Sequence, residues 1–341
     1  MLTAGDGELL ILHRGARMLG LFIAKCEENL LWTHPALRAA DSADALFVEG
    51  GWNVGGDRTW LAPEVDVCFP AFPDTSICRC PAALDPGGYQ ARATGTDEAS
   101  SVLVNRFGLI LSRAKSTVSL ELAKGWHAAA YPLLPGAEPL PADVAHVGYT
   151  QTSTLTVLGC DRLVEIGLWS LLQVPYGGEC LVSTHGVAST VPYVGAVTPG
   201  ELRASERLLR YRPSTPGIHK IGIRAQALTG RVGYLQQVGD TATLVVRAFD
   251  VDPTGAYVDT AWRTPDDLAA PGCPAQLCAV DDAALGRYVE LEHHAPALRI
   301  DPASGVAPMG AATDVSRVWA FRGSAPQVRT IAERIFEYIP N

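Results

Sequence analysis

Short apolar segments separated by turn-forming residues run along almost the whole of this 341-residue chain. The chain carries 33 glycines and 24 prolines, residues that favour turns and interrupt helices. Segments such as Glu8–His13, Met18–Ile23 and Thr152–Leu158 are apolar or rich in β-branched residues, as strands are. Regular alternation of strands with helices is missing, which argues against a parallel α/β fold. The pattern therefore predicts an all-β protein, built as one large antiparallel sandwich.

Near the C-terminus the spacing of apolar residues is that of a helix and not of a strand. Apolar residues recur at three- and four-residue spacing within 325–339, with charged residues outside the apolar stripe. This predicts an amphipathic C-terminal helix that covers a sheet edge or face.

A second, short helix is expected over Glu201–Arg210, because Thr198-Pro199-Gly200-Glu201 has the spacing of a capping box.

Composition limits the class of protein. Hydrophobic residues make up 48% of the chain and charged residues 18%, which permits a sizeable core and predicts a single domain over 1–341. Residues 70–98 are crowded with proline and glycine and are expected to form a long loop-rich insertion. The net charge of −9 argues against nucleic acid or an anionic membrane as the partner.

The sequence also indicates the expected compartment of the protein and the expected redox state of its cysteines. No apolar run is long enough to span a bilayer, and the first residues lack the features of an export signal. We therefore expect a cytoplasmic protein, or a periplasmic or secreted one from which a signal peptide was removed. The 8 cysteines are expected to be mostly reduced and scattered, with one or two disulfides as the alternative.

One segment, residues 51–64, concentrates the chemistry of sugar recognition. Arg58 offers a planar fork of donors, and Trp60 offers a flat apolar face. Asp57 and Glu64 can accept hydrogen bonds from hydroxyl groups. The segment therefore suits a polar, ring-shaped ligand. The alternative is a glycine turn followed by a strand whose arginine and glutamate pair structurally.

Other segments add charged side chains to this set. Lys220 stands at the start of an expected strand, and Glu290 and Glu292 are two residues apart, so they share one face of another strand. A solvated face is the alternative for the two glutamates. His127 and His185 are candidate acids, each with an ordinary surface or core role as the alternative. No phosphate-loop, dinucleotide or zinc-binding motif occurs, so neither a cofactor nor a metal is expected.

Several segments together resemble the galactose mutarotase-like (aldose epimerase) superfamily. The most specific is Gly55-Gly56-Asp57-Arg58-Thr59-Trp60-Leu61-Ala62-Pro63-Glu64, which looks like a segment of bacterial branches of that superfamily. The strands of Glu8–Trp32, the run Ile166-Gly167-Leu168-Trp169-Ser170 with Gln173-Val174-Pro175, His219–Ile223, Val289–Pro296 and Trp319 follow in the same order as in those branches. The similarity thus spans most of the chain in short, scattered motifs.

The resemblance implies a β-supersandwich with a carbohydrate-binding cleft on its concave face. In aldose epimerases a late glutamate is the base at the anomeric hydroxyl, and Glu292 is the nearest match, with Glu290 second. A histidine is the acid at the ring oxygen. Its Asn-His-x-Tyr-Phe-Asn segment has no counterpart in this sequence, which leaves the acid open.

The sequence therefore predicts a carbohydrate-active protein, leaning towards an acid–base isomerase or epimerase. Glu292 or Glu64 would serve as base, and His127 or His185 as acid. Arg58 and Lys220 would favour an acidic sugar such as a uronate. Two alternatives are a non-catalytic carbohydrate-binding protein and a lyase or glycosidase that acts on an acidic sugar.

Overall fold

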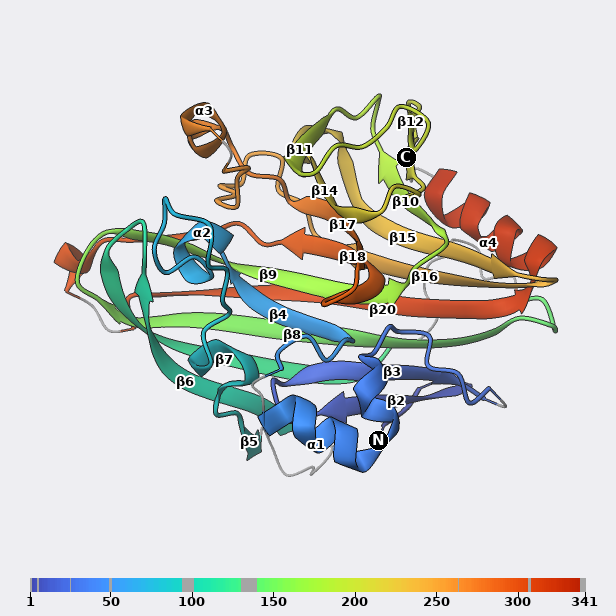
Figure 1. Cartoon of the computed structure of the whole chain (residues 1–341), viewed down its shortest axis with the longest axis horizontal. Helices are drawn as coiled ribbons and strands as arrows, with labels where there is room; N and C mark the ends of the chain where they lie inside the picture. The colour runs from blue at the N-terminus through green and yellow to red at the C-terminus, as the bar shows by residue number, and fades with distance from the viewer. Residues whose placement is uncertain are drawn as a thin grey trace.

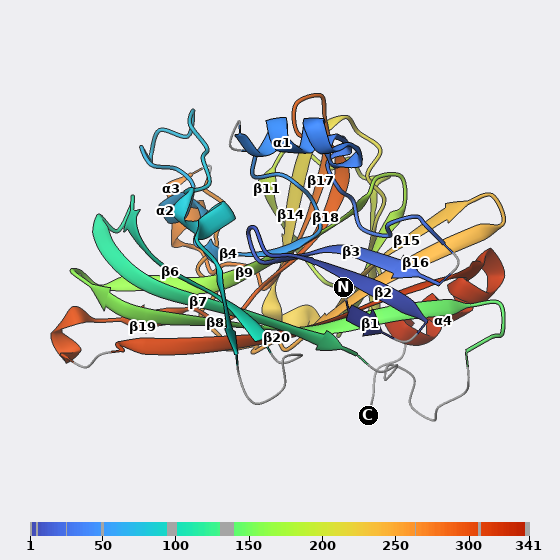
Figure 2. The same cartoon turned by 90° about the horizontal axis from the view of Figure 1, so that it is seen from below.

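The fold consists of two large antiparallel sheets. The computed structural model describes residues 2–4, 6–24, 26–48, 51–93, 101–129, 140–262, 264–305 and 308–337. Within these residues each sheet has ten strands, and every strand pair is antiparallel. The long strands cross the molecule side by side in Figure 1, and Figure 2 shows the same strands from below. The predicted all-β class with a C-terminal helix is confirmed.

The first sheet has the order β1-β2-β3-β4-β9-β18-β17-β14-β11, and β19 pairs with β9. Its strands are β1 Leu2–Ala4, β2 Gly7–Leu12, β3 Arg17–Ile23, β4 Asp57–Ala62, β9 Val164–Pro175, β11 Thr190–Val194, β14 Gly217–Ile223, β17 Ala275–Asp282, β18 Gly286–His294 and β19 Leu298–Ile300.

The second sheet has the order β12-β13-β10-β15-β16-β20-β8-β7-β6-β5. Its strands are β5 Gln90–Ala93, β6 Ser101–Leu111, β7 Ser116–Ala128, β8 Ala145–Cys160, β10 Glu179–Thr184, β12 Leu202–Ala204, β13 Leu208–Tyr211, β15 Leu228–Val238, β16 Thr241–Phe249 and β20 Gly310–Ser324.

Strand alternation places the main core between the two sheets. On β18, Val289 and Leu291 are fully buried and belong to the same apolar cluster as Val245 and Val318 of the second sheet. The residues between them on β18 must point to the opposite face, because side chains alternate along a strand. Glu290, Glu292 and His294 therefore lie on the outer face of the first sheet, whereas His293 lies on the inner face, where it pairs with Asp314 of β20.

The C-terminal helix covers the outer face of the second sheet. Helix α4, Ala325–Glu337, lies beside β16 and β20 (Figure 1). It buries Val328, Ile331 and Phe336 against residues of these strands. The apolar stripe read from the sequence is the face that packs. The last two residues of the predicted range, 338 and 339, lie outside the described residues.

The helix expected over Glu201–Arg210 is wrong, because this segment forms β12, a turn and β13. The Glu201 carboxylate does accept a hydrogen bond from the amide of Thr198, as a capping box requires. It also accepts bonds from the amides of Ser214 and Thr215, which lie beyond β13. Those bonds tie the two ends of the hairpin together, and a helix through the same residues would not allow this.

The remaining helices are short. They are α1 Ala40–Val48, α2 Glu64–Val67, α3 Pro265–Ala269, the 3-10 turns Pro35–Arg38, Ala225–Ala227 and Pro302–Ser304, and a π-turn at Ala83–Gly87. The expected insertion at 70–98 holds that π-turn and β5, and its residues 94–98 lie outside the described part of the chain. All eight cysteines are free thiols. None of the described helices has the length and apolar character needed to cross a membrane.

Candidate functional site

Charged side chains gather on the outer face of the first sheet, where β4, β18 and β14 carry them. Arg58 lies opposite Leu171 in the β4–β9 pair, and Leu171 lies opposite Glu292 in the β9–β18 pair. On the other side, Glu290 lies opposite Cys278, which lies opposite Lys220 of β14. The register of neighbouring strands thus brings residues from positions 58, 220, 290 and 292 to one face. We call Arg58, Glu64, Lys220, Glu290 and Glu292 the charged cluster.

Lys220 and Glu292 form the centre of the charged cluster. The Lys220 Nζ atom lies 3.0 Å from Glu292 Oε2, and the Trp169 Nε1 atom donates a hydrogen bond of 2.7 Å to the same oxygen. Lys220 Nζ also lies over the Trp169 ring, 4.6 Å from its centroid. The Glu292 side chain has 0% exposure. A buried carboxylate is tolerated only with such partners, because ionised groups lose hydration on burial.

A second pair lies beside the first. Arg58 Nη2 donates to Glu290 Oε1 at 2.9 Å, and Gln173 Nε2 donates to the same oxygen at 2.9 Å. The Arg58 guanidinium also packs on two indole rings, 4.4 Å from the Trp60 centroid and 5.5 Å from that of Trp52. The cation is therefore held by one carboxylate and two aromatic faces.

Glu64 approaches the cluster from outside the sheet, because it begins α2. Its Oε2 atom lies 3.7 Å from Lys220 Nζ, and its side chain is 20% exposed. The Glu64 amide donates a 2.7 Å hydrogen bond to Asp259 Oδ1, and Gln276 Nε2 donates to Asp259 Oδ2 at 2.8 Å. Asp259 thus joins the start of α2 to β17. Of the five cluster members, Glu64 is the most exposed to solvent.

Burial changes the proton affinities of both carboxyls around Lys220. Burial raises the pKa of Glu292 to about 7, with Glu290 and Glu64 adding to the rise and Lys220 opposing it. The pKa of Glu64 is also raised, first by burial and then by the charges of Asp259 and Glu290, against the effect of Lys220. A carboxyl with a pKa near neutrality can accept or donate a proton under ordinary conditions.

Several buried polar atoms on this face have no hydrogen-bond partner among the described residues. They include one carboxylate oxygen, two guanidinium nitrogens and two amide oxygens: Glu292 Oε1, Arg58 Nε and Nη1, Gln173 Oε1 and Gln276 Oε1. Buried polar groups are normally paired, so an unpaired set on one face suggests a place for a polar ligand. Donors and acceptors are both present, as a ligand with hydroxyl groups requires.

Three residues proposed from the sequence lie elsewhere. Asp57 precedes Arg58 on β4, so it points to the opposite face, where it accepts a 2.6 Å hydrogen bond from Tyr149 Oη and pairs with Arg247. His127, at the end of β7 in the second sheet, and His185, just after β10, are both exposed. None of the three belongs to the charged cluster.

The sequence reasoning did not select His294 or Asp259 for this face. The His294 ring stacks on Trp169 at 5.6 Å between centroids, and its Nε2 atom lies 3.9 Å from Asp259 Oδ2. Burial lowers the pKa of His294 to about 3, against the effect of Asp259. Strand alternation could have indicated His294, because it lies two residues after Glu292 and therefore on the same face of β18.

A metal ion is a poor fit to the cluster. Cys278, Glu290 and Glu292 offer ligand atoms that lie within 4.8 Å of one another. The carboxylates are already paired with Arg58 and Lys220, so an added cation would meet two positive charges. Burial and both glutamates also raise the pKa of the Cys278 thiol, which opposes formation of the thiolate ligand.

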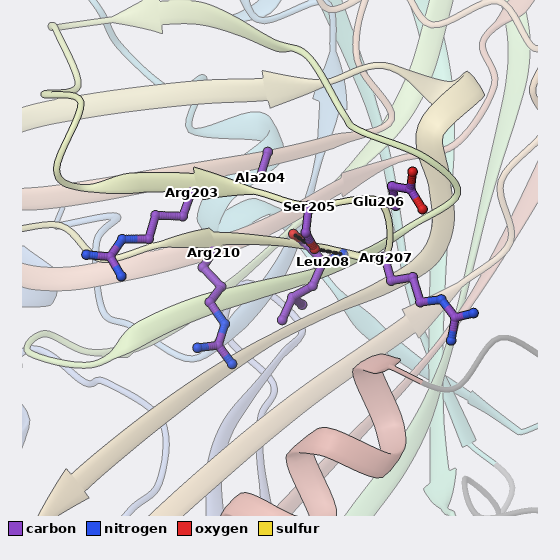
Figure 3. Close-up of a pocket in the computed structure, with 7 residues that line it drawn as sticks. All are labelled: Arg203, Ala204, Ser205, Glu206, Arg207, Leu208 and Arg210. Carbon is purple, nitrogen blue, oxygen red and sulfur yellow. Dashed lines mark hydrogen bonds between the residues drawn. The ribbon is translucent and has the colours of Figure 1, made fainter.

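A wide hollow at the β12–β13 hairpin lacks the features of a binding site. It encloses about 610 Å³ around the β12–β13 hairpin and is lined by residues 203–208 and 210. Figure 3 shows the guanidinium groups of Arg203 and Arg207 at opposite ends of this hairpin, pointing away from each other. All three of its arginines are exposed, so they are not desolvated around a common point. We therefore assign function to the charged cluster.

Comparison with solved structures finds structural similarity at low sequence identity. The chain is structurally similar to a protein of Escherichia coli K12 that carries a provisional assignment as an aldose 1-epimerase. The TM-score is 0.49 at 12% identity, covering 94% of this chain and 97% of that one. The Slr1438 protein of Synechocystis sp. PCC 6803 gives a TM-score of 0.45 at 11% identity, covering 94% and 93%.

A TPR-domain containing protein of Parabacteroides distasonis ATCC 8503 gives a TM-score of 0.40 at 12% identity, covering 92% of this chain and 45% of that one. No protein-family model matches the chain. A search of curated proteins finds no match.

Proposed function

We propose that this protein acts on a carbohydrate by acid–base catalysis, as an isomerase or epimerase, with Glu292 as the general base. One observation carries the proposal: Glu292 is fully buried, one of its oxygens is fixed by Lys220 and Trp169, and the other has no partner among the described residues. A base needs this combination of a fixed orientation, a free lone pair and a pKa near 7. The sequence resemblance to aldose epimerases supports a sugar as the substrate.

The proposed step is the opening of a cyclic sugar. Glu292 Oε1 removes the proton of the anomeric hydroxyl, the carbonyl forms at the anomeric carbon, and its bond to the ring oxygen breaks. An acid gives a proton to the ring oxygen at the same time. Closure on the other face reverses both transfers and produces the second anomer, so the reaction consumes no further reactant. The buried indoles of Trp60 and Trp169 lie opposite each other on the same side of the sheet.

The charges in the cluster favour a neutral sugar over a uronate. The positive charges of Arg58 and Lys220 are already matched by Glu290 and Glu292, and Glu64 adds another carboxyl. A uronate would bring a further negative charge into this group. One observation favours the uronate nonetheless, namely that Nε and Nη1 of Arg58 have no partner within the described residues. Both sugar classes therefore belong in the test.

The test measures the rate of anomer exchange by NMR for D-glucose, D-galactose, D-glucuronate and D-galacturonate. Wild-type protein is expected to accelerate exchange of at least one sugar. Glu292→Gln should abolish that acceleration, because an amide cannot accept the proton. Glu165→Gln, at an exposed glutamate of β9, is the matched control and should keep the wild-type rate. Exchange at the uncatalysed rate with all four sugars would refute the proposed reaction.

A non-catalytic carbohydrate-binding role is the second candidate. It is favoured by the closure of the cluster into two ion pairs, Arg58 with Glu290 and Lys220 with Glu292, which is an arrangement that also serves stability. Under this candidate a sugar raises the melting temperature of wild type and Glu292→Gln alike, and neither protein accelerates exchange. Thermal-shift measurements on the same four sugars separate the two roles.

A further inference from the structure

We infer that Glu64 is the proton donor that works with Glu292, that the two carboxyls share a single proton around Lys220, and that Asp259 is the positioning residue for Glu64. This inference rests on the proposed function for its catalytic part. The shared proton and the role of Asp259 concern the protein without ligand, and they can be tested separately. The sequence offered only histidines as the acid, and both of those lie away from the cluster.

The geometry around Lys220 supports the pairing. Its Nζ atom lies 3.0 Å from Glu292 Oε2 and 3.7 Å from Glu64 Oε2, so one ammonium faces both carboxyls. One cation fully compensates one carboxylate, and the second carboxylate must then remain protonated or stay uncompensated. Glu292 comes from the sheet, whereas Glu64 comes from α2 outside it. The two carboxyls therefore face Lys220 from different elements of the fold.

Exposure decides which carboxyl is the donor. The Glu64 side chain is 20% exposed, whereas that of Glu292 is 0% exposed. Glu64 can therefore exchange its proton with solvent more readily than Glu292 can. Glu292 is also the carboxyl with the stronger fixed donors, because Trp169 Nε1 and Lys220 Nζ both bind its Oε2 atom at 3.0 Å or less. Donors that bind a carboxylate favour its ionised form, so above about pH 7, where Glu292 has lost its proton, we assign the remaining proton of the pair to Glu64.

Asp259 fixes Glu64 in this state. Its Oδ1 atom accepts the Glu64 amide at 2.7 Å, and its Oδ2 atom is held by Gln276. The Asp259 side chain is 2% exposed, so its charge is poorly screened by water. A negative charge this close raises the pKa of Glu64, in the direction found. The ionisable groups that interact with Glu64 from every neighbouring element are Lys220, Asp259, Glu290, Glu292, Cys68, Cys78 and Cys278.

The proton transfers between the sugar and the two carboxyls balance over one catalytic cycle. Glu292 carboxylate takes the anomeric proton while Glu64 carboxylic acid protonates the ring oxygen, so the proton moves from Glu64 to Glu292 as the ring opens. Ring closure returns it, because Glu292 then protonates the carbonyl oxygen and Glu64 accepts the proton of the ring hydroxyl. The pair begins and ends each cycle with one proton, and the pH profile belongs to the pair and not to either residue.

The first test titrates the carboxyls directly by NMR on protein labelled with carbon-13 at the glutamate carboxyls. Glu64→Gln and Glu292→Gln assign the two signals. We expect both carboxyls to titrate above the ordinary value of 4.5, and Asp259→Asn to lower the Glu64 midpoint. Asparagine keeps an oxygen for the Glu64 amide, so the change removes charge and retains the bond. Asp266→Asn, at an exposed aspartate of α3, is the control and should leave the midpoint unchanged.

The second test uses the pH profile of anomer exchange with a sugar that the wild type turns over. The profile should be bell-shaped, and Asp259→Asn should move its alkaline limb to lower pH by the same amount as the NMR midpoint. If Asp259→Asn lowers the maximal exchange rate but leaves both apparent pKa values of the profile unchanged, Asp259 has a merely structural role.

The two experiments separate the two proposals. A Glu64 midpoint at the ordinary value, or one indifferent to Asp259→Asn, overturns the inference whatever the activity. Absence of exchange with every sugar, together with the expected NMR midpoints, removes the catalytic part along with the proposed function and leaves the shared proton. Full exchange activity in Glu64→Gln overturns the assignment of Glu64 as donor.

Discussion

Replacing Lys220 with methionine isolates the buried charge of Glu292. The ammonium group lies 3.0 Å from a carboxylate with 0% exposure, and methionine keeps most of the apolar stem. A buried ion pair that loses one partner costs about 3–5 kcal/mol when the remaining group stays ionised. Glu292 can avoid that cost by taking up a proton, so the cost should depend on pH.

The sign of that dependence follows from the pKa of Glu292. Burial raises this pKa from 4.5 to about 7. In the wild type, Glu292 therefore makes the folded state less stable as pH rises from 4.5 to about 7, and above pH 7 its contribution no longer changes. Without Lys220 the pKa rises above 7, and each further pH unit costs about 1.4 kcal/mol until the new pKa is reached. The difference between wild type and Lys220→Met should be small at pH 6 and larger by about 3 kcal/mol at pH 9.

The assay is urea denaturation followed by far-ultraviolet circular dichroism at both pH values. Lys115→Met, at an exposed turn lysine, should cost less than about 0.5 kcal/mol at either pH. The double variant Lys220→Met with Glu292→Gln should lose most of the pH dependence, because the charge responsible is gone. A cost for Lys220→Met that is equal at pH 6 and pH 9, and unchanged in the double variant, would refute the reasoning.

Two further predictions concern stability away from the cluster. The Glu201 carboxylate accepts hydrogen bonds from amides and hydroxyls at both ends of its hairpin, and these outweigh burial and lower its pKa. Glu201→Gln should therefore cost about 2 kcal/mol at pH 7, and the loss should shrink as pH falls below 4.5. Urea denaturation against Glu206→Gln, at an exposed glutamate of the same hairpin, checks it, and equal losses at pH 7 and pH 3 would contradict it. Phe336→Ala should cost about 3–5 kcal/mol, because this α4 side chain is 1% exposed. Glu333→Ala, on the exposed side of α4, should cost less than about 0.5 kcal/mol in the same assay, and equal costs would show that the helix does not pack as described.

The fold class could be predicted because its signals are local. Turn residues between short apolar segments indicated strands, and the apolar stripe at the end of the chain indicated α4. The strands β17 and β20 were not identified, although β20 is among the longest in the described structure. It holds alanines, serine and threonine among its apolar residues, so no simple alternation marks it. Its stability comes from long-range pairing with β8 and β16, which a local pattern cannot report.

The candidate site was predictable in part. Arg58, Glu290 and Glu292 could be placed on faces by alternation, and the same rule applied to Asp57 would have removed it from the set. Asp259 could not be found in this way. It lies in a loop, and its place beside Glu64 depends on how residues almost two hundred positions apart meet over the sheet. Proton affinities depend on burial and on neighbouring charges, which exist only in the folded chain.

The most direct test of the central claim is a crystal structure of the protein soaked with the sugar that gives the largest thermal shift. We predict that the sugar lies over the outer face of the first sheet, with its anomeric hydroxyl within hydrogen-bond distance of Glu292 Oε1. A sugar bound at the β12–β13 hollow, with the charged cluster unchanged, would contradict the account.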